Sequence, residues 1–203
     1  TTGTDETGPL KVGAPYIDYA TGLNAAFAIM AAIRQRDKTG ESQTVDVAML
    51  DTALTLMVNN LVTTAATGED MPKLGNEAAS RAPSSGCFTA SDGELLMVAA
   101  NNERQFRDLC GALGHPEWAE DARWSDPITR RSNQEALREL VSAAFATQTA
   151  AQWEAQFDPL GIPASRVRAI SDVIAEGQVA ARGLLHALPV GAEGTSVELP
   201  GIG

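Results

Sequence analysis

The sequence has few of the side chains that build metal and redox sites. It contains two cysteines, Cys87 and Cys110, and two histidines, His115 and His186. Neither pair has the close spacing of a zinc or dithiol motif, which argues against a metal site. We expect both cysteines to be packing residues, because a free cysteine behaves as a small buried hydrophobe.

Basic charge and long apolar runs are also scarce. The 15 Lys and Arg against 26 Asp and Glu give a formal net charge of -11, whereas a nucleic-acid binder needs clustered basic residues. The longest apolar run, Ala25 to Ile33, stops at Arg34, short of the ~18 residues that span a bilayer. With no signal-peptide pattern either, we expect a cytoplasmic protein that binds neither nucleic acid nor a membrane.

Common catalytic motifs are absent as well. The sequence has no GxGxxG, GxxxxGKS/T, GxSxG or HExxH, so the usual phosphate loops, the serine-hydrolase elbow and the zincin site are excluded. The acidic pairs Glu69-Asp70 and Glu120-Asp121 lie in polar loop sequence and are interpreted as solvated charge. Arg130-Arg131 is interpreted as the solvated flank of a helix start, with a phosphate contact as the alternative.

Asp18 remains as the candidate for chemistry. It lies in Gly13–Gly22, where we expect a short strand over Lys11–Ile17 to open onto a helix over Thr21–Lys38. The unpaired amides and positive dipole end of a helix stabilise a nearby carboxylate, which suits a nucleophile. Because Asp is also among the commonest helix caps, the local sequence leaves a capping role and a catalytic role both open.

Residues 1–66 are predicted to contain two strands and two helices. Apolar residues recur at helical spacing over Thr21–Lys38, and Gly40 supplies a helix stop. The alternation in Ser42–Ala48 predicts a second strand, and Met49–Ala66 is predicted to be a second helix. Two short strands offer too little sheet to cover two largely apolar helices, so this block needs packing partners from outside the sequence.

Residues 76–169 are predicted to form a mixed domain of helices and strands. Asp92-Gly93 between two β-prone runs is a hairpin signal. Strands are expected over Cys87–Thr89, Glu94–Ala100 and Ser165–Val167, and helices over Asn102–Leu113, Asn133–Phe145 and Ala150–Phe157.

Two further segments are interpreted as linkers, 67–75 and 170–183. The second is expected to contain a short helix capped by Ser171. A hairpin is predicted within residues 184–203, from Leu184–Val190 and Thr195–Leu199.

The order of short segments along the chain is more specific than any one of them. These segments are Lys11-Val12-Gly13, Asp18, Thr21-Gly22, Thr39–Asp51, Gly75-Asn76, Asp92-Gly93, Asn101–Phe106 and Leu160–Pro163. Together they resemble the class III CoA-transferases, a family that includes formyl-CoA and carnitine CoA-transferases and the α-methylacyl-CoA racemases. The resemblance covers essentially the whole chain.

The resemblance implies an α/β fold assembled from two domains. Residues 1–66 would be an incomplete part of a Rossmann-like large domain that carries the catalytic aspartate, and 76–169 a smaller α+β domain with an antiparallel hairpin and several helices. Residues 184–203 would begin a return to the large domain. The N-terminal half and the C-terminal end of the family's polypeptide would lie outside this sequence.

The resemblance places Asp18 on the family's catalytic aspartate. The implied activity transfers CoA from an acyl-CoA to a carboxylic acid, through aspartyl mixed anhydrides and an aspartyl-CoA thioester. Acyl-CoA is then a substrate, and no cofactor is permanently bound. We hypothesise that amides at a helix start beyond Gly22 stabilise the oxyanions.

The family also has a glycine-containing loop that covers the active-site aspartate. Its counterpart here is Ser84, Ser85 and Gly86, which we expect to lie near the active site and contact CoA, with a plain turn into the hairpin as the alternative. The family's interlocked dimers imply a homodimer in the full-length form, in which the linkers cross between domains, or else a complementary N-terminal half as partner.

Two alternatives stay open. A racemase of this family uses the same aspartate as a base, and Glu103 within an otherwise transferase-like Asn-rich stretch keeps that activity in view. Alternatively, the chain alone is a non-catalytic domain, proteolytic product or subunit, because most CoA contacts in the family come from the N-terminal half. The acidic net charge fits that second possibility.

Overall fold

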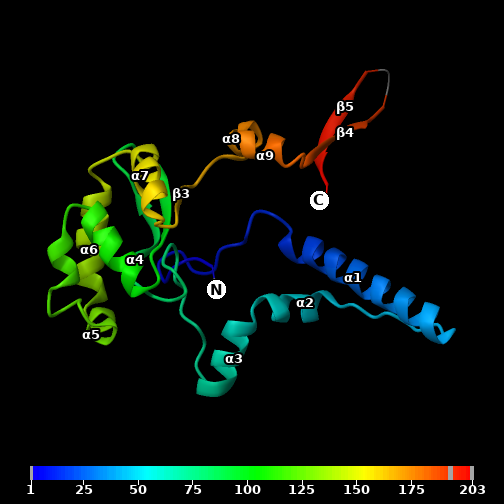
Figure 1. Ribbon diagram of the computed structural model, residues 1–203. Coiled ribbons are helices and arrows are strands. Elements are labelled where there is room, and N and C mark those ends of the chain that lie inside the picture. The colour runs from blue at the N-terminus through cyan, green and yellow to red at the C-terminus, as the bar shows by residue number, and fades with distance from the viewer. Residues whose placement is uncertain (1, 192–193, 202–203) are drawn as a thin grey trace. The chain divides into compact units, whose positions relative to one another are not determined.

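The computed structural model describes residues 2–191 and 194–201 (Figure 1). The chain divides into two compact units, Thr1–Gly75 and Asn76–Gly203. The fold mixes helices with antiparallel sheets, in agreement with the coarse fold class that the sequence predicts.

The first unit contains three helices. They are α1 over Tyr16–Thr39, α2 over Met49–Leu56 and α3 over Val58–Thr67. α1 packs against α2, where the Asn24 side-chain amide lies 3.5 Å from the hydroxyl of the buried Thr52. Gly40 ends α1 in the left-handed conformation and donates its N–H to the Arg36 carbonyl, which confirms the predicted helix stop.

Two strands predicted in this unit do not form. The first, Lys11–Ile17, is irregular as far as Pro15 and helical from Tyr16, where α1 begins. Pro15, with a φ of -79°, occupies the position that precedes the first helical residue. Ser42–Ala48 pairs with no strand among the described residues, and a strand needs a neighbour for its backbone hydrogen bonds. The second predicted helix is divided at Met57, whose ψ of 24° departs from helical geometry.

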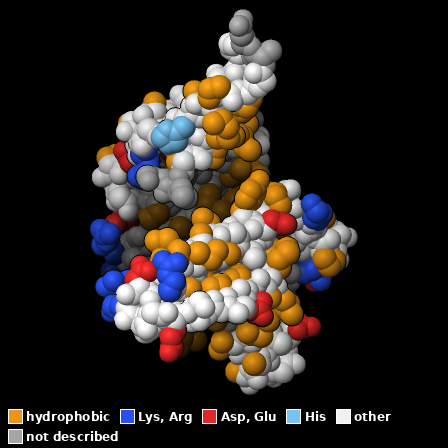
Figure 2. Space-filling view, turned by 90° about the vertical axis from the view of Figure 1, so that its right-hand side faces the viewer, with side chains coloured by type: hydrophobic (Ala, Val, Ile, Leu, Met, Phe, Trp, Pro, Cys, Tyr) orange, Lys and Arg blue, Asp and Glu red, His pale blue; other side chains and the backbone are white. Residues whose placement is uncertain are grey.

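The expectation that no segment is long enough to span a bilayer has to be corrected at α1. By length and composition the 24-residue helix is able to cross a membrane, although a helix from the core of a soluble protein passes the same test. None of its residues is buried, and Figure 2 shows hydrophobic side chains gathered at the surface of the molecule. The exposed large side chains of α1 are Tyr16, Tyr19, Leu23, Phe27, Ile29, Met30 and Ile33.

The second unit is built on a three-stranded antiparallel sheet in the order β1-β2-β3. The strands are β1 over Ser85–Thr89, β2 over Leu95–Ala99 and β3 over Ala164–Arg166. Gly93 turns the chain between β1 and β2 with a φ of 80°, so the hairpin predicted at Asp92-Gly93 is confirmed.

Helices α4 to α7 close a hydrophobic core around this sheet. They are α4 over Glu103–Ala112, α5 over Pro127–Ser132, α6 over Gln134–Phe145 and α7 over Ala150–Phe157, with 3-10 turns at Pro116–Ala119 and Asp158–Leu160. Thr149 starts α7 with a capping box. The Phe145 ring stacks on Phe88 at 4.7 Å between centroids and meets Trp153 edge-on at 5.5 Å.

The predicted helical face of α4 is buried, including Cys110. Burial raises the pKa of the Cys110 thiol to about 12, which suits the packing role that the sequence assigns to it. Cys87 is half-buried in β1.

Arg130 corrects the interpretation of Arg130-Arg131 as a solvated pair. Its side chain is only 9 % exposed and its guanidinium binds both carboxylate oxygens of Glu103, at 3.0 and 2.8 Å. It also donates to the Trp124 carbonyl at 2.7 Å and lies 3.7 Å from the centroid of the Phe106 ring. Arg130 therefore joins α5 to α4, whereas Arg131 is exposed as expected.

The end of the chain holds two short helices and a hairpin. α8 spans Ile170–Ala175 and α9 spans Gly177–Ala181, and α8 is capped by Ala169 rather than by Ser171. β4 over Leu185–Pro189 pairs with β5 over Ser196–Pro200, which confirms the second predicted hairpin.

Replacing Arg130 with Ala is expected to destabilise the second unit by about 2–4 kcal/mol, because the Trp124 carbonyl and Glu103 lose their partner. The matched control Arg131→Ala, at an exposed position on the same helix, is expected to change stability by less than about 0.5 kcal/mol. Urea unfolding followed by tryptophan fluorescence measures both values. Equal effects of the two substitutions would contradict the structural role of Arg130.

The Glu103–Arg130 pair is also expected to make stability depend on pH. The hydrogen bond from Arg130 holds the pKa of Glu103 below its usual value of 4.5. A lowered pKa in the folded state contributes stability above the usual value, and this contribution is lost as pH falls through the lowered pKa. The stability difference between wild type and Glu103→Gln is therefore expected to shrink as the pH falls from about 6 through the usual pKa of 4.5 and below it. A constant difference in urea titrations would exclude this linkage.

Candidate functional site

Asp18 is the third residue of α1 and is exposed. The capping position belongs to Pro15, and no side-chain hydrogen bond caps this end of the helix. The alternative that Asp18 caps the helix is therefore wrong. Its carboxylate lies in the first turn, where the helix dipole favours negative charge.

The start of α1 leaves backbone donors free beside Asp18. The Tyr16 N–H donates to the Ala14 carbonyl and the Tyr19 N–H to the Pro15 carbonyl. The amides of Ile17 and Asp18 donate to no oxygen among the described residues. These are the unpaired donors expected at a helix start.

The predicted place of the oxyanion donors has to be corrected. Gly22 lies in the second turn of α1, so the amides beyond it belong to the hydrogen-bond ladder of the helix. The free donors instead come from the residues at and just before Asp18. The reason is that α1 begins at Tyr16, whereas the sequence predicts a helix that begins at Thr21.

Ser84 lies in a turn that leads into β1, the first strand of the hairpin, and a covering role over Asp18 stays a prediction. Ser85 and Gly86 begin β1, and both serines are 1 % exposed within the second unit. The Ser84 hydroxyl donates to the Ala100 carbonyl at 2.8 Å, and the Ser85 hydroxyl donates to the Asn101 side chain at 3.0 Å. Their contact with CoA stays a prediction, but both hydroxyls already have partners within this unit.

Gly86 has a backbone reason to be glycine. Its φ is 129°, and a Cβ at this position would lie 2.6 Å from the Asn76 carbonyl oxygen. Any larger residue would force β1 away from the segment that precedes it. The glycine is thus accounted for by close backbone approach.

Glu103 is engaged in the ion pair with Arg130. Both of its carboxylate oxygens accept hydrogen bonds from the guanidinium. No sequence pattern predicts this contact, because the rest of α4 and a 3-10 turn separate the two partners along the chain. An arginine at the start of a polar segment is predicted to be solvated when its partner is not known.

The remaining acidic groups show no cluster suited to a metal ion. No group of three or more His, Cys, Asp and Glu side chains comes together in residues 2–191 and 194–201. Within the pair Glu120-Asp121, the Asp121 carboxylate accepts hydrogen bonds from Arg123 at 2.7 and 3.0 Å. These bonds lower the pKa of Asp121 to about 2, so this acid is locally paired rather than simply solvated.

Comparison with known proteins finds relatives by sequence and similar folds by structure. A succinyl-CoA:glutarate CoA-transferase of Mus musculus is 31% identical over 184 residues, covering 91% of this chain and 42% of its own. A succinyl-CoA–D-citramalate CoA-transferase of Chloroflexus aurantiacus is 29% identical, covering 89% of this chain and 45% of its own. The crystal structure of Rv3272 from M. tuberculosis superposes with a TM-score of 0.82 at 25% identity, over 98% of this chain and 51% of its own.

The extent of these matches shows what part of the family the chain represents. It spans a little under half the length of the curated relatives. The model of CoA-transferase family III matches residues 1–202, almost all of the sequence. The chain therefore belongs to CoA-transferase family III.

Proposed function

We propose that this chain carries the nucleophile of a class III CoA-transferase, and that the nucleophile is Asp18. The observation that carries the proposal is an exposed carboxylate in the first turn of α1, beside two free amides, in a chain of this family. An exposed carboxylate is accessible to a thioester, and the free amides provide donors for the negative charge that develops in the reaction.

The proposed reaction proceeds through two anhydrides and one thioester. The Asp18 carboxylate attacks the acyl carbonyl of the donor, the C–S bond breaks, and CoA leaves as a thiolate. The thiolate attacks the Asp18 carbonyl, releasing the donor acid as a carboxylate and leaving aspartyl-CoA. The acceptor carboxylate attacks the carbonyl of this thioester, which releases the CoA thiolate and forms the second mixed anhydride. The thiolate then attacks the acceptor's carbonyl in that anhydride, which gives the acceptor's CoA thioester and releases the Asp18 carboxylate.

No step of this sequence requires a proton to be moved. Carboxylates and thiolates attack and leave as anions, so a general base beside Asp18 is unnecessary. Each attack produces a tetrahedral oxyanion, and the Ile17 and Asp18 amides are the local donors that support its stabilisation. The helix dipole acts in the same direction.

The names of the relatives support dicarboxylic substrates. Glutarate and D-citramalate each carry two carboxylates, and succinyl-CoA keeps a free carboxylate beside its thioester. We infer a dicarboxylyl-CoA donor and a dicarboxylic acceptor for the protein that contains this chain. The net charge of -11 favours basic residues from elsewhere in that protein as partners of the second carboxylate and of the CoA phosphates.

The quaternary and domain arrangement belongs to the same proposal. We infer that residues 1–66 form part of a Rossmann-like large domain, that the full-length protein is a homodimer in the cytoplasm, and that the isolated chain is inactive. The absence of any buried residue in α1 supports this, since an apolar helix needs a cover to be stable in water. Both carboxylate oxygens of Glu103, the residue that keeps a racemase in view, are bound by Arg130, and this supports the transferase.

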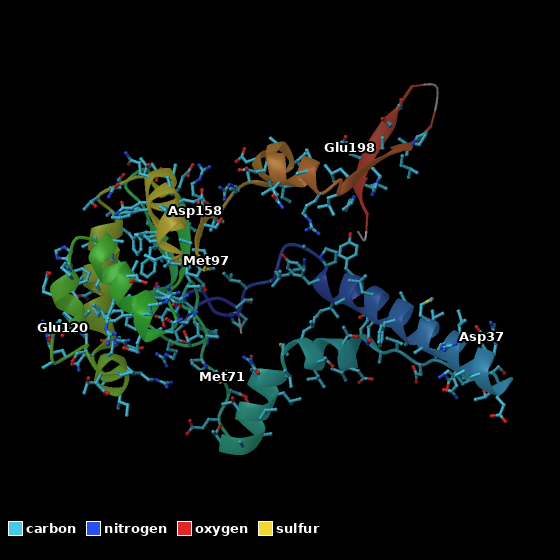
Figure 3. All side chains as sticks on the ribbon, viewed as in Figure 1. Asp37, Met71, Met97, Glu120, Asp158 and Glu198 are labelled. Atoms are coloured by element: carbon cyan, nitrogen blue, oxygen red, sulfur yellow. The ribbon has the colours of Figure 1, made fainter. Side chains whose placement is uncertain are left out.

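Asp18→Asn in the full-length protein is expected to lower CoA transfer by about 10³-fold or more, because the amide is a poor nucleophile and forms no anhydride. The matched control is Asp37→Asn, at an exposed acid in the last turn of the same helix (Figure 3). It is expected to retain wild-type transfer from succinyl-CoA to glutarate. The measurement is the initial rate of glutaryl-CoA formation.

Covalent trapping tests the intermediate directly. With succinyl-CoA, wild type and Asp37→Asn are expected to show a CoA adduct on Asp18 by mass spectrometry, which hydroxylamine converts to a hydroxamate. Absence of the adduct together with full activity of Asp18→Asn would refute the nucleophile. Exchange of the α-proton with deuterated water, without CoA transfer, would instead support the racemase.

A further inference from the structure

Gly22 lacks the usual structural reasons for glycine inside a helix. It lies in the second turn of α1 and is not among the glycines with positive φ. A Cβ built on it meets no atom within 4 Å among the described residues. Glycine lowers helix stability relative to alanine, so α1 gives up stability here with no packing or conformational gain in this unit.

The position of Gly22 relative to Asp18 offers a reason. The two residues are four apart in the helix, so they are neighbours on one face. Helical side chains lean toward the N-terminus and cover the preceding turn. Any side chain at position 22 would therefore lean over the turn that carries the Asp18 carboxylate.

Thr21, the other residue that borders this turn, has its hydroxyl directed onto the helix backbone. The hydroxyl donates to the Ile17 carbonyl at 2.6 Å, four residues back, and does not extend away from the helix. The packing of α1 on α2 involves Asn24 and Thr52 and leaves Gly22 exposed. No side chain from Thr21 or Gly22 therefore extends away from the helix surface on the C-terminal side of Asp18.

We propose that Gly22 is a positioning residue that keeps room for the groups which Asp18 carries during CoA transfer. This inference rests on the proposed function. Asp18 bears an acyl group in each anhydride and CoA in the thioester, and each step passes through a crowded tetrahedral carbon. A methyl or isopropyl group at position 22 would displace these groups from the line of attack, while leaving the carboxylate itself intact.

The test is a series of full-length variants, Gly22→Ala and Gly22→Val, with succinyl-CoA as the probe. The rate of Asp18 adduct formation at saturating succinyl-CoA is expected to fall about tenfold for Ala and about 10²-fold for Val, in line with the cost of small misplacements. The melting temperature of Gly22→Ala is expected to equal or exceed that of wild type, since alanine is the better helix former.

Gly111→Ala is the matched control. Gly111 is also helical, in α4, and a Cβ there likewise meets nothing within 4 Å. The control is expected to keep the adduct rate of wild type. Its melting temperature gives the gain expected from alanine alone.

Three outcomes would overturn the inference, and they separate it from the proposed function. Wild-type adduct rates in both Gly22 variants would show that the clearance is unnecessary. A lower melting temperature in Gly22→Ala would show that the glycine serves packing instead. If wild type itself forms no Asp18 adduct, the proposed function fails and this inference fails with it.

Discussion

Most of the apolar surface of α1 is left exposed by the described residues of the unit that contains it. A helix of 24 residues in which none is buried gains little from tertiary packing, and packing of an apolar face supplies most helix stability in proteins. Phe27, for example, is 76 % exposed on this helix. Because Asp18 is fixed to the first turn of α1, whatever covers the helix also sets the surroundings of the candidate nucleophile. The short span of the chain relative to its relatives agrees with a cover supplied from elsewhere.

The second unit shows the opposite balance. Its sheet and helices enclose a core that includes Trp124, Phe145 and Trp153, all nearly inaccessible to solvent. The guanidinium of Arg130 closes one side of this core by binding Glu103 and lying over Phe106. The second unit is therefore stabilised by its own core. Asp18, for which the chemistry is proposed, belongs instead to the unit whose longest helix has no buried residue.

The sequence predicted elements well where the signal was local. Asp92-Gly93 and Gly40 each act through their own backbone conformation, and Thr149 caps α7 through an amide three residues away. Prediction failed where a distant partner decides the structure. Ser42–Ala48 has a strand pattern but no neighbouring strand in the part of the chain that the structure describes, and the burial of Arg130 depends on a glutamate 27 residues earlier.

The start of α1 was predicted wrongly for a different reason, because a signal for the correct start is present in the sequence. Proline is favoured at the beginning of a helix, where its missing N–H costs nothing. Pro15 was thus a better marker of the helix start than Thr21, and it moves Asp18 from the approach to the helix into its first turn. The family of the chain, and with it the role proposed for Asp18, is indicated by the order of many segments rather than by the residues around the helix start.

The place of Asp18 within the first turn matters for the chemistry. An aspartate at the capping position uses its oxygens to accept hydrogen bonds from the first amides, which occupies both the nucleophile and the donors. With Pro15 at that position, the Asp18 carboxylate has no such bond, and the amides of Ile17 and Asp18 stay free. The proposed nucleophile and the proposed oxyanion donors are then separate groups on one helix turn. In the proposed site Gly22 would add access from the adjacent turn, so charge stabilisation and steric clearance would come from different residues of the same helix.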